Sequence, residues 1–314
     1  MHQHLRSLST ATIALLALGA PLKSQTIGVS DEEAMVEVAA PPQGRPEAPF
    51  QPNFKFKLNS SYTFPAKIRG NNGRYGSMSA WEGQLESTAR LGLGRGLSLQ
   101  LGGRYETYQF GGGSAPLPGA LQASTFITAL DWVWRGQPLF SVRASPGWYY
   151  GDEITSESFH VPFFVTTGWR FTLGPESSLL LTVGVAAAYL DQYPVIPIGG
   201  LIWQINKEWT LIALFPDPRL TYALAPGFDL FLNGSLVGGQ FYVEDPRTKG
   251  DGETWLDYYE WRLGLGLQAK PTENFSIGLS GGWSFMRSFE YERRGPDYST
   301  EGAPYLRLEA SVAF

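Results

Sequence analysis

The feature that most constrains the fold is a strict alternation of apolar and polar residues that begins at Phe54 and recurs to the C-terminus. In residues 54–64, large apolar side chains occupy one set of alternate positions, and lysine, serine, threonine and asparagine occupy the other. The same pattern recurs in runs at residues 81–91, 97–106, 159–173 and 275–290. A period of two gives a β-strand one apolar face. We therefore predict an all-β protein made of antiparallel strands.

One apolar face per strand fits either a soluble sandwich or a transmembrane barrel. Here charged residues lie in the middle of the polar faces, among glycine and serine, as in a water-filled lumen. Trp and Tyr gather toward strand ends, where membrane interfaces would lie, for example at Trp81, Tyr150, Trp169 and Trp255. The mean hydropathy of −0.14 is compatible with this pattern, because a polar lumen offsets an apolar outer face. We predict a transmembrane up-and-down β-barrel in the outer membrane of a Gram-negative bacterium.

The polar faces supply the candidate residues that line the lumen. They are Glu82, Glu86, Arg90, Arg104, Glu106, Arg143, His160, Arg170, Glu260, Arg262, Arg307 and Glu309. Opposed Arg and Glu side chains could line a narrow polar pore, or they could pair and close it. Both alternatives remain open at this point.

The connections between runs predict the topology. If Phe314 is periplasmic, every second connection is short, and these connections fall at residues 92–96, 135–137, 174–177, 206–208, 225–227 and 270–274. Most of the external connections are longer, including 65–79 and 291–303. Short periplasmic turns and long external loops are typical of outer-membrane barrels. This assignment predicts 14 strands with both termini periplasmic, or 12 if the segments around 216–218 do not form a hairpin.

The N-terminus predicts export. Arg6 followed by the short apolar stretch 11–22 indicates a signal peptide over residues 1–24. Residues 25–53 are acidic and proline-rich, so we expect a flexible leader, which could act as a plug, a periplasmic tether or a disordered tail. The barrel would then span 54–314. With 24 basic and 29 acidic residues, the chain is not expected to bind nucleic acid.

The last run carries a specific signal. Leu306, Leu308, Ala310, Val312 and the terminal Phe314 share one face, opposite the face that begins with Tyr305. This arrangement resembles the C-terminal strand through which the barrel assembly machinery recognises outer-membrane proteins. The resemblance implies that machinery as a partner, together with outer-membrane lipid and lipopolysaccharide.

A second resemblance rests on four stretches of the C-terminal third. They are residues 198–203, 214–220, 236–241 and 257–266, with Pro216-Asp217-Pro218 and Tyr258-Tyr259-Glu260-Trp261 among them. They are similar to a family of bacterial outer-membrane proteins catalogued only as a domain of unknown function. The resemblance implies a barrel and no particular activity.

Few residues are suited to catalysis. There is no cysteine, and beyond the N-terminus the only histidine is His160, two residues after Ser158 and near Asp152 and Glu153. Barrel hydrolases need a base of this kind, but a lone histidine without a motif is weak support. The acids of loop 244–253 could at best hold Ca²⁺, without the EF-hand spacing, so no metal or cofactor is expected. We predict a non-enzymatic, porin-like passive or gated conduit for small polar solutes. The alternatives are a structural or adhesive barrel and, third, a hydrolase using His160.

Overall fold

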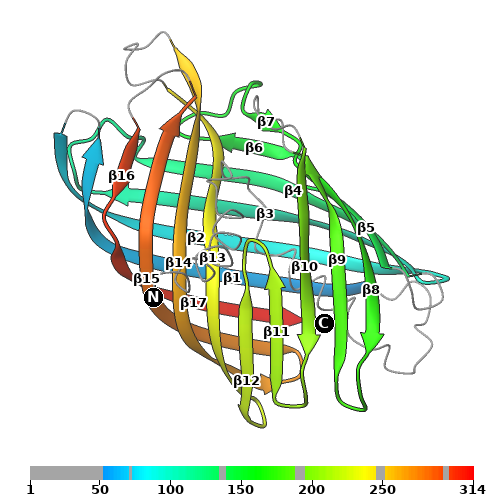
Figure 1. Ribbon diagram of the computed structural model, residues 1–314. Helices are drawn as coiled ribbons and strands as arrows, with labels where there is room; N and C mark the ends of the chain where they lie inside the picture. The colour runs from blue at the N-terminus through cyan, green and yellow to red at the C-terminus, as the bar shows by residue number, and fades with distance from the viewer. Residues whose placement is uncertain (1–51, 71–72, 134–138, 188–194, 245–251, 293–296) are drawn as a thin grey trace, which may run out of the picture.

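The computed structural model describes residues 52–70, 73–133, 139–187, 195–244, 252–292 and 297–314. They form one closed antiparallel sheet, which curves round into a tilted barrel (Figure 1). The predicted all-β barrel is therefore confirmed. No helix in the described part of the chain is long and apolar enough to cross a membrane. The predicted signal peptide and almost all of the leader lie outside the described residues.

The sheet contains 17 strand segments. They are β1 (Pro52–Gly70), β2 (Gly73–Gly94), β3 (Leu97–Gly111), β4 (Ala120–Val133), β5 (Leu139–Ala144), β6 (Gly147–Tyr150), β7 (Phe159–His160), β8 (Phe163–Thr172), β9 (Ser178–Ala187), β10 (Ile196–Gln204), β11 (Trp209–Leu214), β12 (Arg219–Ala225), β13 (Phe228–Glu244), β14 (Glu253–Thr272), β15 (Phe275–Tyr291), β16 (Tyr298–Thr300) and β17 (Ala303–Ala313). Three barrel strands are each interrupted once, as β5–β6, β7–β8 and β16–β17, so the barrel has 14 strands.

Each strand pairs with its neighbours in the chain, and the first and last strands close the barrel. β1 pairs with β17 from Lys55↔Ala313 to Thr63↔Tyr305. The backbone N–H of Phe314 also donates to the carbonyl oxygen of Phe54 at 2.9 Å. β11 and β12 pair from Trp209↔Tyr222 to Ile212↔Arg219, so the uncertain hairpin is real and the strand count is 14 rather than 12.

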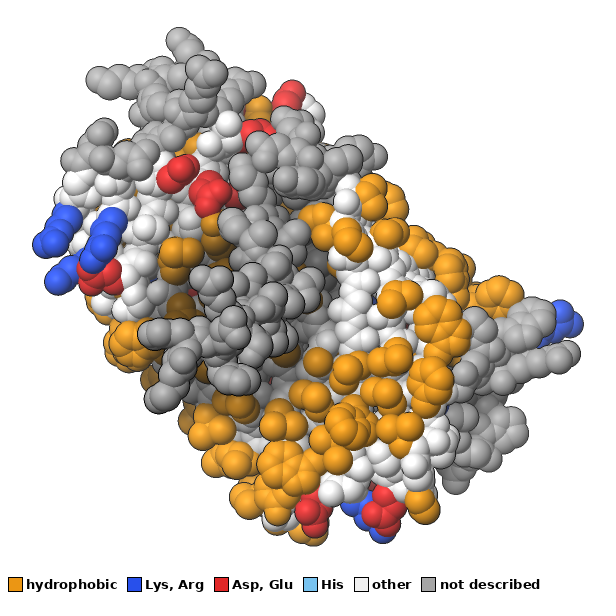
Figure 2. All heavy atoms as spheres, viewed as in Figure 1, with side chains coloured by type: hydrophobic (Ala, Val, Ile, Leu, Met, Phe, Trp, Pro, Cys, Tyr) orange, Lys and Arg blue, Asp and Glu red, His pale blue; other side chains and the backbone are white. Residues whose placement is uncertain are grey.

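The distribution of side chains is the reverse of that in a soluble protein. Large apolar residues point outward, and examples are Phe56, Leu85, Phe126 and Leu279, which are exposed by 41%, 54%, 58% and 60%. Charged and polar residues on the alternate positions are buried inside. Figure 2 shows the consequence on one face, where apolar side chains cover the wall and charged side chains lie toward its two ends. The outer surface suits a lipid environment.

The two ends of the barrel differ in their connections. One end, here called the turn end, carries Phe54, Phe314 and short connections such as 95–96, 226–227 and 273–274. The other, the loop end, carries the connections 112–119 and 151–158. The turn-end connections agree in position with the short turns expected from the sequence.

The predicted loop 65–79 is wrong, because β1 continues to Gly70 and β2 begins at Gly73. The alternation is hidden there by Pro65, which lies at a register shift between Thr63 and Ala66 in the β1–β2 pairing. A bulge tolerates proline because the ladder hydrogen bond is already interrupted. Beyond the bulge, Ile68 and Met78 are buried inside the barrel.

The barrel also changes width along its axis. The strands β8 to β12 have 6 to 10 residues each, whereas β1, β2, β13, β14 and β15 have 17 to 22. At the loop end, beyond the short strands, β6 pairs with β13 in parallel at Tyr150↔Tyr242. The Gly151 N–H there donates to the Tyr242 carbonyl oxygen at 2.9 Å. This join bypasses β7 to β12, so the loop-end half has fewer strands around it than the turn-end half.

Candidate functional site in the lumen

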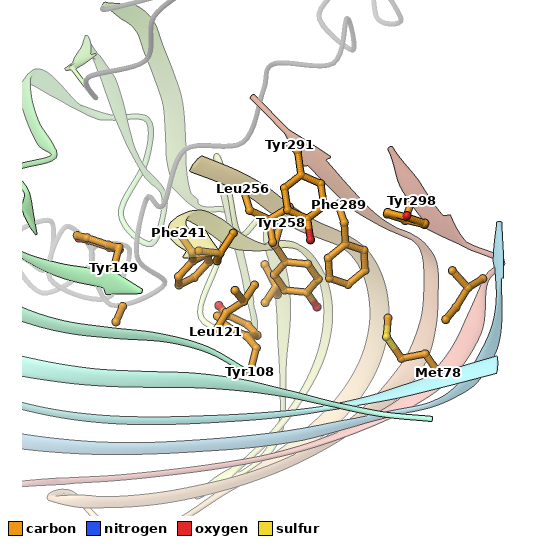
Figure 3. Packing of buried hydrophobic residues seen from close by; sticks show 14 residues of the cluster. Met78, Tyr108, Leu121, Tyr149, Phe241, Leu256, Tyr258, Phe289, Tyr291 and Tyr298 are labelled. Carbon is orange, nitrogen blue, oxygen red and sulfur yellow. The ribbon is translucent and has the colours of Figure 1, made fainter. Parts of the chain in front are cut away.

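The loop-end half of the lumen is filled by a cluster of buried apolar side chains (Figure 3). This aromatic cluster consists of Ile68, Met78, Tyr108, Leu121, Ala123, Tyr149, Val237, Phe241, Val243, Leu256, Tyr258, Phe289, Tyr291 and Tyr298. The ring of Tyr258 lies 5.0 Å from that of Phe289 and 5.1 Å from that of Tyr108, centroid to centroid. Such ring pairs each contribute about 0.5–1.5 kcal/mol beyond the burial of area. The cluster thus packs large side chains from several strands into the interior of this half.

A layer of buried charges lies next to the aromatic cluster, centred on Arg262. Its guanidinium donates to Glu82 through Nη1 at 2.7 Å and to Glu260 through Nε at 2.9 Å. Three hydroxyl groups complete the network. Thr63 and Tyr258 donate to Glu260 at 2.9 and 3.0 Å, and Ser61 donates to Glu82 at 2.8 Å. Both carboxylates therefore have hydrogen-bonded partners, which buried charges require.

Further pairs extend this layer around the wall. Arg104 Nε donates to Glu86 at 3.1 Å. Arg90 and Arg143 lie on either side of Asp131, with guanidinium nitrogens 3.5 and 3.7 Å from its carboxylate oxygens. Of the two arrangements left open by the sequence, the structure shows pairing, because opposed Arg and Glu side chains meet as ion pairs.

The turn-end half holds an open cavity of about 360 Å³ between the charged layer and the turns. Most of the residues that line it are polar or charged. Its walls include Lys57, Asn59, Gln84, Glu86, Thr210, Ile212, Asp217, Arg219, Thr221, Asp229, Asn233, Gln268, Lys270, Ser276, Gly278, Arg307, Glu309 and Ser311. Ile212 also lines the cavity and belongs to a buried apolar cluster with its register neighbours Leu180 and Ile202 across β9, β10 and β11. A solute entering this cavity would meet mainly polar and charged side chains.

The predicted lumen residues are distributed unevenly over these regions. Glu82, Glu86, Arg104, Glu260 and Arg262 come together in the charged layer, where all five are buried. Glu106 lies close by and accepts a hydrogen bond from the Tyr108 hydroxyl. Arg307 and Glu309 pair with each other at 2.8 Å on the cavity wall. Arg170 is half-buried on β8, and the layer described above does not include it.

Sequence reasoning missed several residues of the same interior. Asp131 is the acid shared by Arg90 and Arg143, and Arg287 is fully buried and donates to the Met78 carbonyl oxygen at 2.7 Å. Asp217 and Arg219 on the cavity wall were also missed. Period two along β4 could have identified Asp131. Arg287 could not be found in this way, because a register shift between Trp261 and Arg262 displaces the parity of β15.

The aromatic residues that the sequence predicts at membrane interfaces fall into two groups, those that face outward and those that are buried. Trp81 and Trp169 face outward, with 38% and 40% of their surface exposed. Tyr150 and Trp255 do not follow this assignment. Tyr150 is buried at the β6–β13 join, and Trp255 packs against the aromatic cluster. Proximity to a strand end alone therefore does not distinguish an outward aromatic residue from an inward one.

His160 lies in an aromatic setting on β7. Its ring centroid lies 5.9 Å from that of Tyr149 and 6.0 Å from that of Trp255. The Ser158 hydroxyl donates to the Thr155 carbonyl oxygen at 2.8 Å, so its hydrogen is engaged within the loop. Among the described residues, no group of three or more His, Asp or Glu is placed to hold a metal ion. Asp245 and Asp251, considered for Ca²⁺, lie outside the described residues.

Comparison with known proteins places the chain in a family. Residues 143–313 match the family described as Domain of unknown function (DUF6268), and the chain belongs to that family. No curated protein matches the sequence significantly. The resemblance inferred from the C-terminal stretches is thus confirmed.

Several solved structures show a distant likeness. The COG4313 outer membrane channel from Pseudomonas putida F1 is 10% identical, with 87% of this chain and 99% of that chain covered and a TM-score of 0.46. The TodX monoaromatic hydrocarbon channel deltaS2 mutant is also 10% identical, with 85% of this chain and 91% of that chain covered and a TM-score of 0.45. A Pseudomonas aeruginosa FadL homologue is 9% identical, with 84% of this chain and 90% of that chain covered and a TM-score of 0.44. The properties of the present barrel rest on its own residues.

Proposed function

We propose that this protein is an outer-membrane barrel that acts as a gated conduit for small polar solutes and is closed at its loop end. The observation that carries the proposal is the polar cavity of about 360 Å³ inside a closed barrel with an apolar outer face. Eight strands make a barrel that side chains can fill, so a 14-strand barrel has room for a channel unless something occupies it. At the turn end that room is present.

The membrane placement in this proposal follows from the outer surface. The outward band would contact outer-membrane lipid and lipopolysaccharide, with both termini on the periplasmic side. Leu306, Leu308 and Phe314 are exposed by 52%, 44% and 70% on the last strand. These side chains are available to the barrel assembly machinery as the C-terminal signal.

The aromatic cluster is the closed gate in this proposal. A conductance measurement on the refolded mature protein in planar bilayers tests it, with Phe289→Ala as the opening variant. Phe289 is fully buried and lies 5.1 Å from Phe110, centroid to centroid. Truncating a buried Phe to Ala costs about 3–5 kcal/mol of packing. If about a third of this cost destabilises the closed state and not the open state, the open probability rises about tenfold.

Phe285→Ala is the matched control, because Phe285 is on the same strand and faces outward with 55% of its surface exposed. We expect rare discrete openings in the wild type and in the control, and frequent openings in Phe289→Ala. The same frequency in both variants would remove the aromatic cluster as the gate.

The second candidate is a structural or adhesive barrel that acts through its external loops. The observation that favours it is the same packed loop-end half, together with the paired charges of Arg262. In that case no current steps appear in the wild type or in either Phe variant. A folded barrel that stays silent in all three would favour this role over the conduit.

A further inference from the structure

We propose that Asp217 and Asn233, which line the turn-end cavity, and the neighbouring Ser235 bind the ammonium group of a small amine. The inference rests on the proposed function, because it names the class of solute that the conduit takes up. Asp217 lies between β11 and β12, and Asn233 and Ser235 lie on β13. They are here called the acceptor cluster.

The backbone sets these three residues side by side. Pro216 and Pro218 accept hydrogen bonds from the N–H groups of Leu236 and Gly234, at 3.1 and 2.8 Å. Segment 216–218 therefore runs along β13, with Asp217 level with Ser235. Asn233 is one register pair further toward the turn end, opposite Arg219.

All three side chains are buried, and each carries an oxygen without a hydrogen-bond partner among the described residues. Asp217, Asn233 and Ser235 have 7%, 8% and 3% of their surface exposed. Within the described part of the chain, neither carboxylate oxygen of Asp217 has a hydrogen-bond partner, and the same holds for Asn233 Oδ1 and Ser235 Oγ. Asp217 and Asn233 line the cavity. A buried carboxylate is strongly destabilised unless a donor or a cation reaches it.

The nearby cations are engaged with other acceptors. Arg307 pairs with Glu309, and Arg262 pairs with Glu82 and Glu260. The Arg219 guanidinium lies 3.7 Å from the Phe231 ring centroid and donates to Gln268 at 3.0 Å. Asp217 interacts electrostatically with two arginines, Arg307 and Arg262, and with two glutamates, Glu309 and Glu82. Positive and negative neighbours are therefore equal in number around this carboxyl group.

The chemistry of the cluster selects an ammonium group. A primary ammonium presents three N–H donors and no acceptor, which matches one carboxylate, one amide oxygen and one hydroxyl. Ca²⁺ prefers six to eight oxygen ligands, usually with several carboxylates, and the cluster holds only one. The cavity of about 360 Å³ leaves room for the rest of a small amine beyond the cluster.

Titration calorimetry on the full mature protein, refolded in detergent, tests this site with three probes of equal length. Putrescine carries two ammonium groups, 1,4-butanediol two hydroxyls and succinate two carboxylates. We expect saturable binding of putrescine, and binding of the other two that is at least about tenfold weaker, as the loss of a charge-assisted hydrogen bond implies. Calcium chloride is the fourth probe.

Asp217→Asn should weaken putrescine binding about tenfold or more, because it removes the only charge of the cluster. Asp229→Asn is the matched control: Asp229 lines the same cavity but pairs with Lys270 at 2.6 Å. Its putrescine affinity should stay near that of the wild type. Heat-modifiable migration on gels shows that each variant is folded.

Three results would overturn the site. They are equal binding of putrescine and butanediol, equal loss in the two Asp variants, and calcium binding that itself depends on Asp217. The conductance experiment is independent of these. A conducting barrel that does not bind putrescine loses only the site, and a silent barrel that binds it through Asp217 loses only the conduit.

Discussion

The loop-end and turn-end halves of this barrel share several strands but enclose different interiors. The inner face of β14 shows the contrast most clearly. From the loop end it presents Tyr258, then Glu260 and Arg262, then Gly264 and Gln268. One strand thus contributes to the aromatic cluster, the charged layer and the cavity wall in turn.

The difference follows from the number of strands at each level. Where β6 joins β13 and bypasses β7 to β12, the circumference is small enough for large rings to fill the interior. Where all 14 strands are present, the same kind of wall leaves a cavity. The comparison teaches that the width of the barrel, set by strand length and by one parallel join, decides which half is open.

The largest expected effect concerns Gly238, which lies on β13 between the part paired with β12 and the part joined to β6. Its φ is +117°, and an added Cβ would lie 2.1 Å from the Tyr258 carbonyl oxygen. A β-branched residue is strained there and collides with backbone. We expect Gly238→Val to lose most of its folded barrel, measured by heat-modifiable migration and circular dichroism after refolding.

Gly278→Ala is the control for this experiment. Gly278 lies on β15 in the turn-end half, and the nearest atom to an added Cβ is 3.7 Å away, an ordinary contact. This variant should refold as the wild type does. A normal yield of folded Gly238→Val would mean that the join between the two halves does not depend on this backbone conformation.

The next effect concerns the charged layer that separates the two halves. Arg262→Met leaves Glu82 and Glu260 buried without their shared cation. Removing one partner of a buried pair costs about 3–5 kcal/mol, so the free energy of unfolding in urea should fall by that order. Lys207→Met, which breaks an exposed pair with Glu176 at the turn end, should leave it unchanged. Equal stability of the two variants would show that the layer does not hold the halves together.

Much of this architecture could be predicted from the sequence, because an apolar outer face and a polar inner face impose a period of two on every long strand. The pattern identified the lumen side of Glu82, Arg104, Glu260 and Arg262, which the structure places inside. It does not encode which strands are short or where β6 leaves its neighbours to meet β13. Those features depend on pairing between distant residues.

The aromatic cluster was hidden for a related reason. Tyr108 and Tyr258 lie on the face that the alternation assigns to polar residues, so they appear as interruptions of the pattern. Phe289 has the parity of the apolar outer face, and the register shift in β15 turns it inward. Asp217 was missed because it lies outside any strand, and its burial follows from the path of 216–218 along β13. The alternation of apolar and polar residues predicts side-chain orientation only within strands. It cannot predict the burial of a residue such as Asp217, which lies in a connection between strands.

The smallest expected effect sharpens the comparison at the join itself. A Cβ added at Gly151 would lie 3.5 Å from the Cβ of Val243, within the range of disulfide bonds. The native chain has no cysteine to compete. The double variant Gly151→Cys with Val243→Cys should therefore oxidise spontaneously, measured by protection from a maleimide reagent, and should change stability little because these segments already meet.

Gly119→Cys with Val243→Cys is the control, since a Cβ at Gly119 has no atom within 4 Å. It should remain reactive with maleimide. If the closed half opens by separation of β6 from β13, the oxidised form of the first variant conducts less than its reduced form. Equal conductance in both redox forms would restrict the opening motion to the side chains of the aromatic cluster, with the narrow half of the wall staying intact.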